Sequence, residues 1–184
     1  MLLFLSVIEN QAVRNQLESI YIRYAKELIF VSHGILQDYH EAEDIVQTAM
    51  IKVSDYIDET TDAESKSIRG LLVIIVRRLS YDVYNQRRRR NESNVDDFRD
   101  TLGDVHTASP ELNILKMEDR RYVADLMAKI NESYMDILTL KYIYEYSDKE
   151  IGELLNMTEG NVRTKLSRAR KACQKIIGGD DSEE

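Results

Sequence analysis

The sequence has little of what crosslinks a chain or interrupts its helices. Among its 184 residues there are one cysteine, one proline, seven glycines and no tryptophan. A single cysteine excludes a disulfide within the chain, and the scarcity of proline and glycine favours a soluble, helix-rich protein. The length allows one domain or two small ones, each with its own core.

Long apolar segments are also missing. Beyond the N-terminus the longest apolar run is residues 71–76, which is far too short to span a bilayer. Residues 1–10 are apolar, but no basic residue precedes the apolar run and Glu9 ends it early, so no signal peptide is expected. We therefore expect a cytoplasmic protein without membrane insertion.

The residue patterns of common catalytic sites are absent as well. His40 and Glu41 would fit a zinc motif only if position 44 were a second histidine, and it is aspartate. The sequence has no glycine-rich phosphate loop, no cysteine pair and no nucleophile elbow. Cys173 lies on an apolar helical stripe, where a small core residue is expected. The sequence thus predicts no catalytic residue, no metal site and no cofactor, and so no enzyme.

Positive charge is concentrated in two segments of an acidic chain, whose net charge is -8. Residues 65–90 contain eight basic residues and one acidic residue, Asp82, and end in the arginine run 87–90. Residues 161–177 contain six basic residues and no acidic one. Such segments can approach phosphate locally, although a solvated basic helix is the alternative for residues 161–177.

Apolar periodicity predicts three helices in the N-terminal half. The first ends near Gly34, the second begins after Asp38, whose side chain can cap it, and the third covers residues 68–90. The expected buried positions of the first helix are Val13, Leu17, Ile20, Tyr21, Tyr24, Leu28 and Val31. Those of the second are Ala42, Ile45, Val46, Ala49, Val53 and Ile57, and those of the third are Leu72, Ile75, Leu79 and Val83.

Residues 91–109 interrupt this pattern. They contain five acidic residues and one basic residue without apolar periodicity, which is typical of a linker. Ser109 and Pro110 then predict a new helix start. The expected architecture is all-α, with two small helical domains at 1–90 and 110–177, an acidic linker at 91–109 and an acidic tail at 178–184.

A helix-turn-helix is expected in the second domain. Ser147 and Glu150 form a capping-box pattern for a short helix, and Thr158 can cap the helix that follows a tight turn. On that second helix Val162, Leu166, Ala169 and Cys173 share one apolar stripe. The basic residues lie on the opposite face, so this helix is the candidate recognition helix.

Two of these segments resemble a known family. Residues 137–171 (ILTLKYIYEYSDKEIGELLNMTEGNVRTKLSRARK) look like the promoter-binding C-terminal domain of sigma-70-type RNA polymerase sigma factors. Residues 38–52 (DYHEAEDIVQTAMIK) look like the core-binding helix of the same family. The linker leaves no room for a middle domain, so the chain is similar to the extracytoplasmic-function (ECF) group.

The resemblance implies a transcription initiation factor whose partners are core RNA polymerase, promoter DNA and an anti-sigma factor. The surface for the clamp helices of the largest polymerase subunit would comprise Asp44, Gln47, Ile51 and Lys52. Contacts to the minus-ten element and its backbone would come from Arg77, Arg78, Tyr81, Arg87, Arg88, Arg89 and Arg90, with residues 58–67 as a base-capturing loop. The minus-thirty-five element would be contacted by Thr158, Asn161, Arg163, Thr164, Lys165, Ser167 and Arg168.

The chain also departs from the family pattern. It lacks the aromatic residue common near Leu71, the asparagine common near Arg78, and the Leu-Pro pair expected at positions 130–131. Two alternatives therefore stay open, namely a stand-alone helix-turn-helix regulator and a sigma-like antagonist without promoter recognition. At single positions, Asp44 and Gln47 could be ordinary surface residues, Tyr81 could pack on the bundle, and Asp82 could simply pair with Arg78.

Overall fold

The computed structural model describes residues 3–58, 60–93, 122 and 124–178, and all of its regular secondary structure there is helical. Most of the expected linker and tail, and the helix start expected at Pro110, lie outside these residues. Within the described part, no helix combines the length and apolar character needed to cross a membrane.

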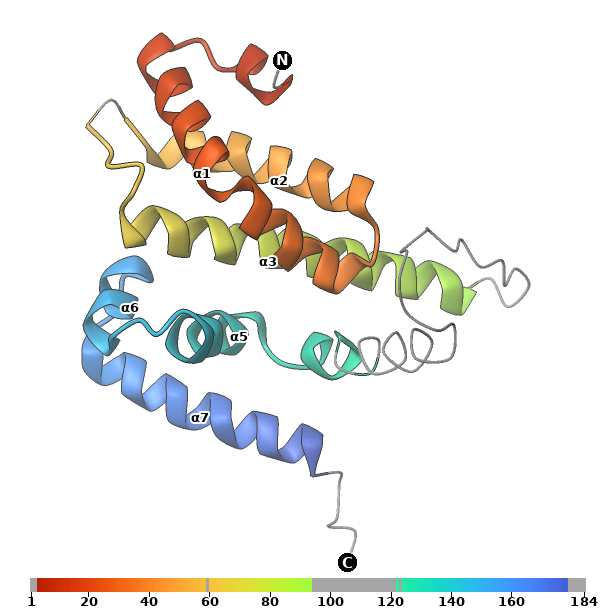
Figure 1. Cartoon of the computed structure of the whole chain (residues 1–184). Coiled ribbons are helices and arrows are strands. Elements are labelled where there is room, and N and C mark those ends of the chain that lie inside the picture. The colour runs from red at the N-terminus through yellow and green to blue at the C-terminus, as the bar shows by residue number, and fades with distance from the viewer. Residues whose placement is uncertain (1–2, 59, 94–121, 123, 179–184) are drawn as a thin grey trace, which may run out of the picture.

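The N-terminal unit is built on three helices (Figure 1): α1 (Gln11–Leu36), α2 (Tyr39–Val53) and α3 (Lys66–Ser93), with short 3-10 turns at Leu3–Val7 and Ser54–Tyr56. Asn10 caps α1 by accepting hydrogen bonds from the Ala12 and Val13 amides. The helix passes Gly34, where an end was expected, because glycine tolerates a helical backbone. It ends before Gln37, whose left-handed φ of 58° turns the chain.

Helix α2 follows its sequence pattern closely. The Asp38 carboxylate accepts the Glu41 amide at 3.0 Å, as expected for a cap. This hydrogen bond is the main reason that the pKa of Asp38 lies below its ordinary value. All six positions of the predicted stripe are buried: Ala42, Ile45, Val46, Ala49, Val53 and Ile57.

The C-terminal unit contains α5 (Glu132–Leu138), a π-helical turn (Thr139–Ile143), α6 (Asp148–Leu154) and α7 (Glu159–Ile177). Its core consists of Ile137, Leu140, Tyr146, Ile151, Val162, Leu166 and Ala169. Cys173 is half-buried at the end of the α7 stripe, and burial raises the pKa of its thiol.

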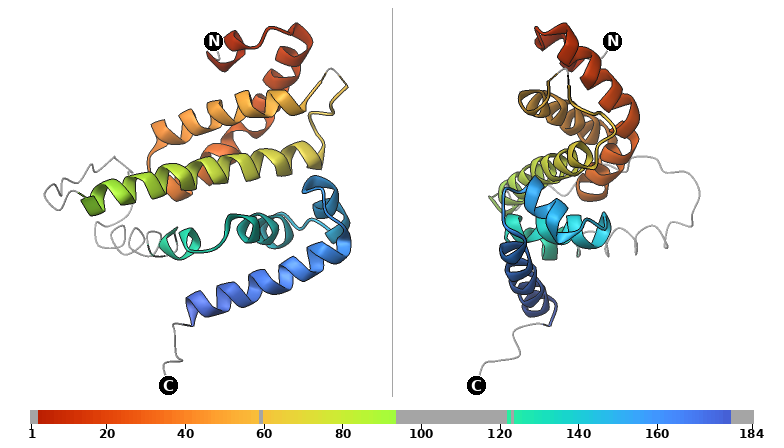
Figure 2. Two further views of the ribbon diagram at one scale, coloured as in Figure 1. Left: turned by 180° about the vertical axis from the view of Figure 1, so that it is seen from behind. Right: turned by 90° about the vertical axis from the view of Figure 1, so that its left-hand side faces the viewer.

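Helix α3 lies between the other two layers, with α1 and α2 on one side and the C-terminal unit on the other (Figures 1 and 2). Leu72 is fully buried in the N-terminal core, as expected, whereas Ile75, Leu79 and Val83 are only half-buried. Ile74, which was not expected in a core, is 4% exposed because it packs into the C-terminal core. One helix therefore contributes to two cores, and only tertiary packing produces the second.

Candidate nucleic-acid and polymerase interfaces

The helix-turn-helix is held by a reciprocal capping box. The Ser147 amide donates to Glu150 Oε2 at 2.8 Å, and the Glu150 amide donates to Ser147 Oγ at 3.2 Å. The hydrogen bond from the Ser147 amide is the main reason that the pKa of the Glu150 carboxyl is lowered to about 2, and the side chains of Ser147 and Lys66 lower it further. The predicted helix start is therefore confirmed, and it fixes where α6 begins.

The turn between α6 and α7 requires close backbone approach. The Met157 amide donates to the Gly152 carbonyl at 2.7 Å, and a Cβ at Gly152 would lie 2.6 Å from the Met157 carbonyl oxygen. Asn156 has a φ of 53°, in the left-handed region. Thr158 Oγ1 then accepts the Asn161 amide at 3.2 Å and starts α7.

The outer face of α7 is polar and basic because Val162, Leu166 and Ala169 bury the other face. Lys165 is half-buried, and the remaining predicted minus-thirty-five residues are all exposed: Thr158, Asn161, Arg163, Thr164, Ser167 and Arg168. An open groove of about 470 Å³ runs between this face and the start of α5. Asn161, Thr164, Lys165 and Arg168 line it, so four predicted site residues share one concave surface.

Arg163 is held on this surface by two acidic residues. Its Nη2 lies 3.1 Å from Glu159 Oε2, one turn earlier on α7. Its Nε lies 3.6 Å from Asp148 Oδ2 on α6, which also pairs with Lys141 Nζ at 2.7 Å through Oδ1. The α6 start thus orients a predicted base-contacting side chain.

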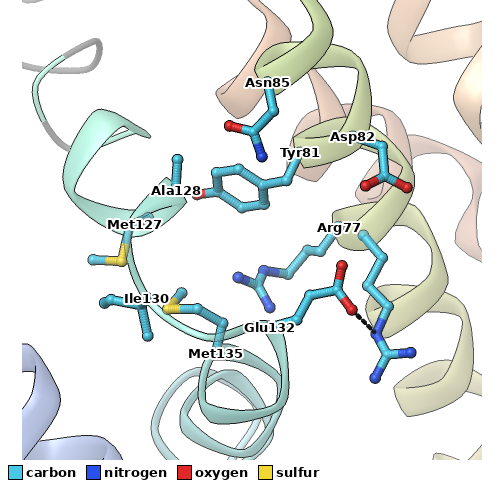
Figure 3. A pocket seen from close by; sticks show the side chains of 10 residues that line it. Arg77, Tyr81, Asp82, Asn85, Met127, Ala128, Ile130, Glu132 and Met135 are labelled. Carbon is cyan, nitrogen blue, oxygen red and sulfur yellow. Dashed lines mark ion pairs between the residues drawn. The ribbon is translucent and has the colours of Figure 1, made fainter.

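The corresponding arginines of α3 are in a different environment (Figure 3). Arg77 is 7% exposed, and its Nη1 lies 3.7 Å from Asp136 Oδ1 on α5. Arg78 donates to Asp136 Oδ2 through Nη2 at 2.5 Å and Nε at 3.0 Å, and it lies 3.8 Å from Glu132. The hydrogen bond to Asp136 is the main reason that the pKa of Arg78 is raised.

Tyr81 points into a cavity of about 210 Å³ between α3 and the C-terminal unit (Figure 3). The Arg77 guanidinium carbon lies 5.6 Å from its ring centroid, and burial raises the pKa of its phenol. Met127 and Met135 close the opposite wall. The principal partner of Arg78 is Asp136, and not Asp82 as one alternative had it, although Asp82 adds a smaller electrostatic contribution.

The arginine run 87–90 has a partly structural role. Arg87 forms an ion pair with Glu41 and donates to the Leu36 carbonyl at 3.2 Å, which ties α3 to the α1–α2 turn. Arg88 lies 3.5 Å from Asp125 of the C-terminal unit. Arg88, Arg89 and Arg90 are nevertheless exposed enough to meet a polyanion.

The predicted polymerase surface lies on the face of α2 opposite its buried stripe. Asp44 and Lys52 are exposed, Ile51 is 41% exposed and Gln47 is half-buried. All four residues therefore present atoms to solvent on one helix. An exposed isoleucine between charged residues suits a protein contact better than a nucleic-acid contact.

Several residues at the contact between the units were missed from the sequence. They are Asp136, Tyr146, Lys66 and Gly70. Asp136 accepts a hydrogen bond from Arg78 across 58 positions of the chain, and Tyr146 donates one to Lys66 across 80. No local pattern could have found them, because a lone aspartate or glycine in a helix has no periodic signal. Among the described residues there is no cluster of three or more potential metal ligands.

Comparison with known proteins agrees with this architecture. Residues 20–90 match the family model for sigma-70 region 2, and residues 120–173 match that for sigma-70 region 4. The ECF RNA polymerase sigma factor SigW of Bacillus subtilis (strain 168) is 28% identical over 161 residues, covering 84% of each chain. SigM of the same organism is 24% identical over 160 residues, covering 87% of this chain and 94% of SigM.

A solved structure shares the fold. The structure described as CnrH in complex with the cytosolic domain of CnrY aligns with a TM-score of 0.55 at 16% identity, covering 98% of both chains. The two matched regions together span more than half of this chain, in the order that the family requires. The chain therefore belongs to the sigma-70 family of RNA polymerase sigma factors, in its ECF group. Its function is that of a promoter-directing transcription initiation factor.

Proposed function

We propose that this chain directs polymerase by dividing the work between its two helical units. The N-terminal unit, at residues 1–90, docks on core polymerase and stabilises opened minus-ten DNA. The C-terminal unit, at residues 110–177, positions the complex on the minus-thirty-five element. The observation that carries this proposal is the exposed basic face of α7 behind a capped turn, in a chain of net charge -8.

The α7 face suits the major groove of duplex DNA. A helix fits that groove, and an arginine there can donate to two acceptors of one guanine. Arg163 and Arg168 are exposed on this face, and Arg163 is already oriented by Glu159 and Asp148. We assign base contacts to these two arginines, and supporting contacts to the other predicted residues of the α7 face.

Polymerase docking is assigned to the α2 surface of Asp44, Gln47, Ile51 and Lys52. Its mixture of both charges around an apolar side chain is typical of a protein–protein contact. Because polymerase would hold both units at once, each DNA contact can be weak on its own. Linked weak contacts then give promoter affinity through effective concentration.

The remaining assignments concern partners and location. An anti-sigma factor would be a protein partner, as the family resemblance implies. The similar solved structure is itself a protein complex, of CnrH with the cytosolic domain of CnrY. We assign the protein no catalytic activity of its own and place its action in the cytoplasm, where bacterial polymerase and promoters meet. The arginines of α3 and the run 87–90 would stabilise the opened strand and its backbone.

Co-elution of the purified chain with bacterial core RNA polymerase tests this proposal. The wild-type chain should co-elute, and a double variant with Asp44→Ala and Gln47→Ala should not. Glu18→Ala, which removes one exposed acidic residue from α1, is the charge-matched control and should bind as wild type does. Failure of the wild type to bind, together with specific shifts of duplex DNA by the free chain, would favour a stand-alone regulator instead.

A further inference from the structure

Asp148, the first residue of α6, contacts Arg163 from outside the helix that carries it. Its Oδ2 lies 3.6 Å from Arg163 Nε, and its Oδ1 accepts a hydrogen bond from Lys141 Nζ at 2.7 Å. We propose that Asp148 is a positioning residue for promoter specificity, which together with Glu159 directs Arg163 to a guanine edge and away from the DNA backbone. This inference rests on the proposed role of Arg163 in reading the minus-thirty-five element.

The Asp148 carboxylate is held in a fixed position. Its side chain is 23% exposed, and the hydrogen bond from Lys141 ties it to the π-helical turn that precedes α6. The turn between α6 and α7 is constrained as well, because the Met157 amide donates to the Gly152 carbonyl and Gly152 has no room for a Cβ. The fold therefore sets the distance at which Asp148 meets Arg163, which is unusual for an exposed arginine.

The two carboxylates approach different parts of the Arg163 guanidinium. Asp148 faces Nε, and Glu159 Oε2 accepts a hydrogen bond from Nη2 at 3.1 Å. A guanidinium has five N–H donors, so those on Nη1 and the second one on Nη2 remain at the end of the fork. Donors at this end can bond the two acceptors that one guanine presents in the major groove.

The same carboxylates disfavour contact between Arg163 and a phosphate. Two cationic and two anionic side chains form one cluster of ion pairs: Arg163, Lys141, Asp148 and Glu159. The charge of Arg163 is therefore already compensated in the free chain. A phosphate on Arg163 would bring a further negative charge next to Asp148 and Glu159, whereas a guanine edge is neutral. The cluster thus selects a neutral acceptor for Arg163.

A purely structural role is the competing explanation for Asp148. An acidic residue in the first turn of a helix interacts favourably with the helix dipole, and Asp148 lies in the first turn of α6. That role predicts a loss of stability on substitution and no change in base preference. The two explanations therefore differ in what a substitution does to DNA recognition.

The test uses holoenzyme reconstituted from the full chain and bacterial core RNA polymerase. Duplex DNA with randomised promoter elements is bound, and the bound and unbound fractions are sequenced. Asp148→Asn removes the negative charge with little change of shape and keeps an acceptor for Lys141. Glu153→Gln, at an exposed position of α6, is the matched control for lost negative charge. Thermal unfolding of each free variant checks the fold.

The wild type and the control should share a guanine preference at one position, which Arg163→Ala abolishes. Asp148→Asn should lower this preference by about three- to tenfold, a part of what a bidentate arginine–guanine contact provides. Duplexes without that guanine should bind Asp148→Asn more tightly than the control, because Arg163 can then reach a phosphate. The salt-dependence slope on these duplexes should grow by up to about 0.9. Asp148→Glu should regain most of the preference, because it restores the charge.

The outcomes separate the possible failures. An unchanged guanine preference in folded Asp148→Asn, or an equal loss of binding to all duplexes, would overturn the proposal. If Asp148→Asn does not fold, Glu159→Gln decides in its place, because it relaxes the other side of Arg163 without altering α6 and should lower the same preference. A wild type without any guanine preference, or one that Arg163→Ala leaves intact, would instead contradict the proposed base contact of Arg163, and this inference with it.

Discussion

Helices α3 and α7 are built alike but are used differently. Each has an apolar stripe towards its own core and arginines on other faces. On α7 the arginines are exposed, and Arg168 lines an open groove. On α3, by contrast, Arg77 is 7% exposed, and both Arg77 and Arg78 lie against Asp136. A basic helical face therefore indicates that phosphate could be bound, but packing by a distant segment decides whether the face is available.

The first way to sharpen this comparison is to remove apolar side chains from the two faces of α3. Leu72→Ala should lower the free energy of unfolding of the N-terminal unit by about 2–5 kcal/mol, because a fully buried leucine leaves a cavity. Ile74→Ala should instead reduce protection mainly in the C-terminal unit. Hydrogen exchange, read separately for the two units, measures both.

The control for that experiment is Ile22→Ala, on the solvent side of α1, where the side chain is 74% exposed. It should leave exchange in both units nearly unchanged. Equal loss of protection in the N-terminal unit from Leu72→Ala and Ile74→Ala would contradict the assignment of two separate packed faces.

On α7, truncation of an exposed arginine should affect DNA recognition and leave the fold intact. Arg163→Ala and Arg168→Ala should each weaken discrimination at one minus-thirty-five base by about 1–3 kcal/mol. The measurement is promoter-dependent transcription on templates substituted at single positions, with thermal unfolding as a check on the fold. Lys26→Ala, an exposed basic residue on α1, is the charge-matched control. Unchanged base preference in both arginine variants would refute the assigned contacts.

The capping box tests how firmly the start of α6 is fixed. Ser147→Ala removes the acceptor of the Glu150 amide and should lower the free energy of unfolding of the C-terminal unit by about 0.5–2 kcal/mol. Hydrogen exchange of the α6 amides, measured at increasing denaturant concentration, gives this loss of unfolding free energy. Ser19→Ala provides the control, because the exposed Ser19 hydroxyl donates to the Asn15 carbonyl within α1 and caps no helix. A loss no larger than in the control would show that the cap is dispensable.

The smallest expected effect is a pH dependence from Glu150. Its pKa is lowered from 4.5 to about 2 in the folded chain. Because this pKa is lower in the folded than in the unfolded chain, the ionised Glu150 carboxylate stabilises the fold at pH values above about 4.5. This contribution disappears as the pH falls from about 4.5 towards 2. Glu150→Gln should remove that part of the dependence while keeping a capping partner at neutral pH.

Unfolding free energies of the wild type and Glu150→Gln, measured across this pH window, test the effect. The two curves should converge as the pH approaches 2. Parallel curves over the whole range would show that Glu150 is not held as the structure indicates.

Much of each unit could be predicted from the sequence because its signals are local. The caps at Asp38, Ser147 and Thr158 and the buried stripe of α2 depend on residues a few positions apart, and the structure confirms them. The helix-turn-helix and the family followed from the same short-range patterns. The assigned roles of the exposed α2 and α7 residues stay predictions.

Helix packing is harder to predict from the sequence where one helix packs against two neighbouring units. Ile74 lies outside the expected apolar stripe of α3 and packs into the C-terminal core instead. Gly70 carries no sequence signal, and its role is visible only from Tyr146 and Leu154, which lie against it in the folded chain. Arg77 and Arg78 were predicted to contact the minus-ten element, and nothing nearby in sequence indicates that both would form ion pairs with Asp136.

The sequence by itself determined the helices, their caps, the apolar faces and the two basic segments, because each depends on spacing within a few turns. The tertiary structure decided that α3 is shared by two cores and that its arginines are paired with a carboxylate 58 positions away. The physical reason is that a buried ion pair depends on which surfaces exclude water together, and that is a property of the packed chain.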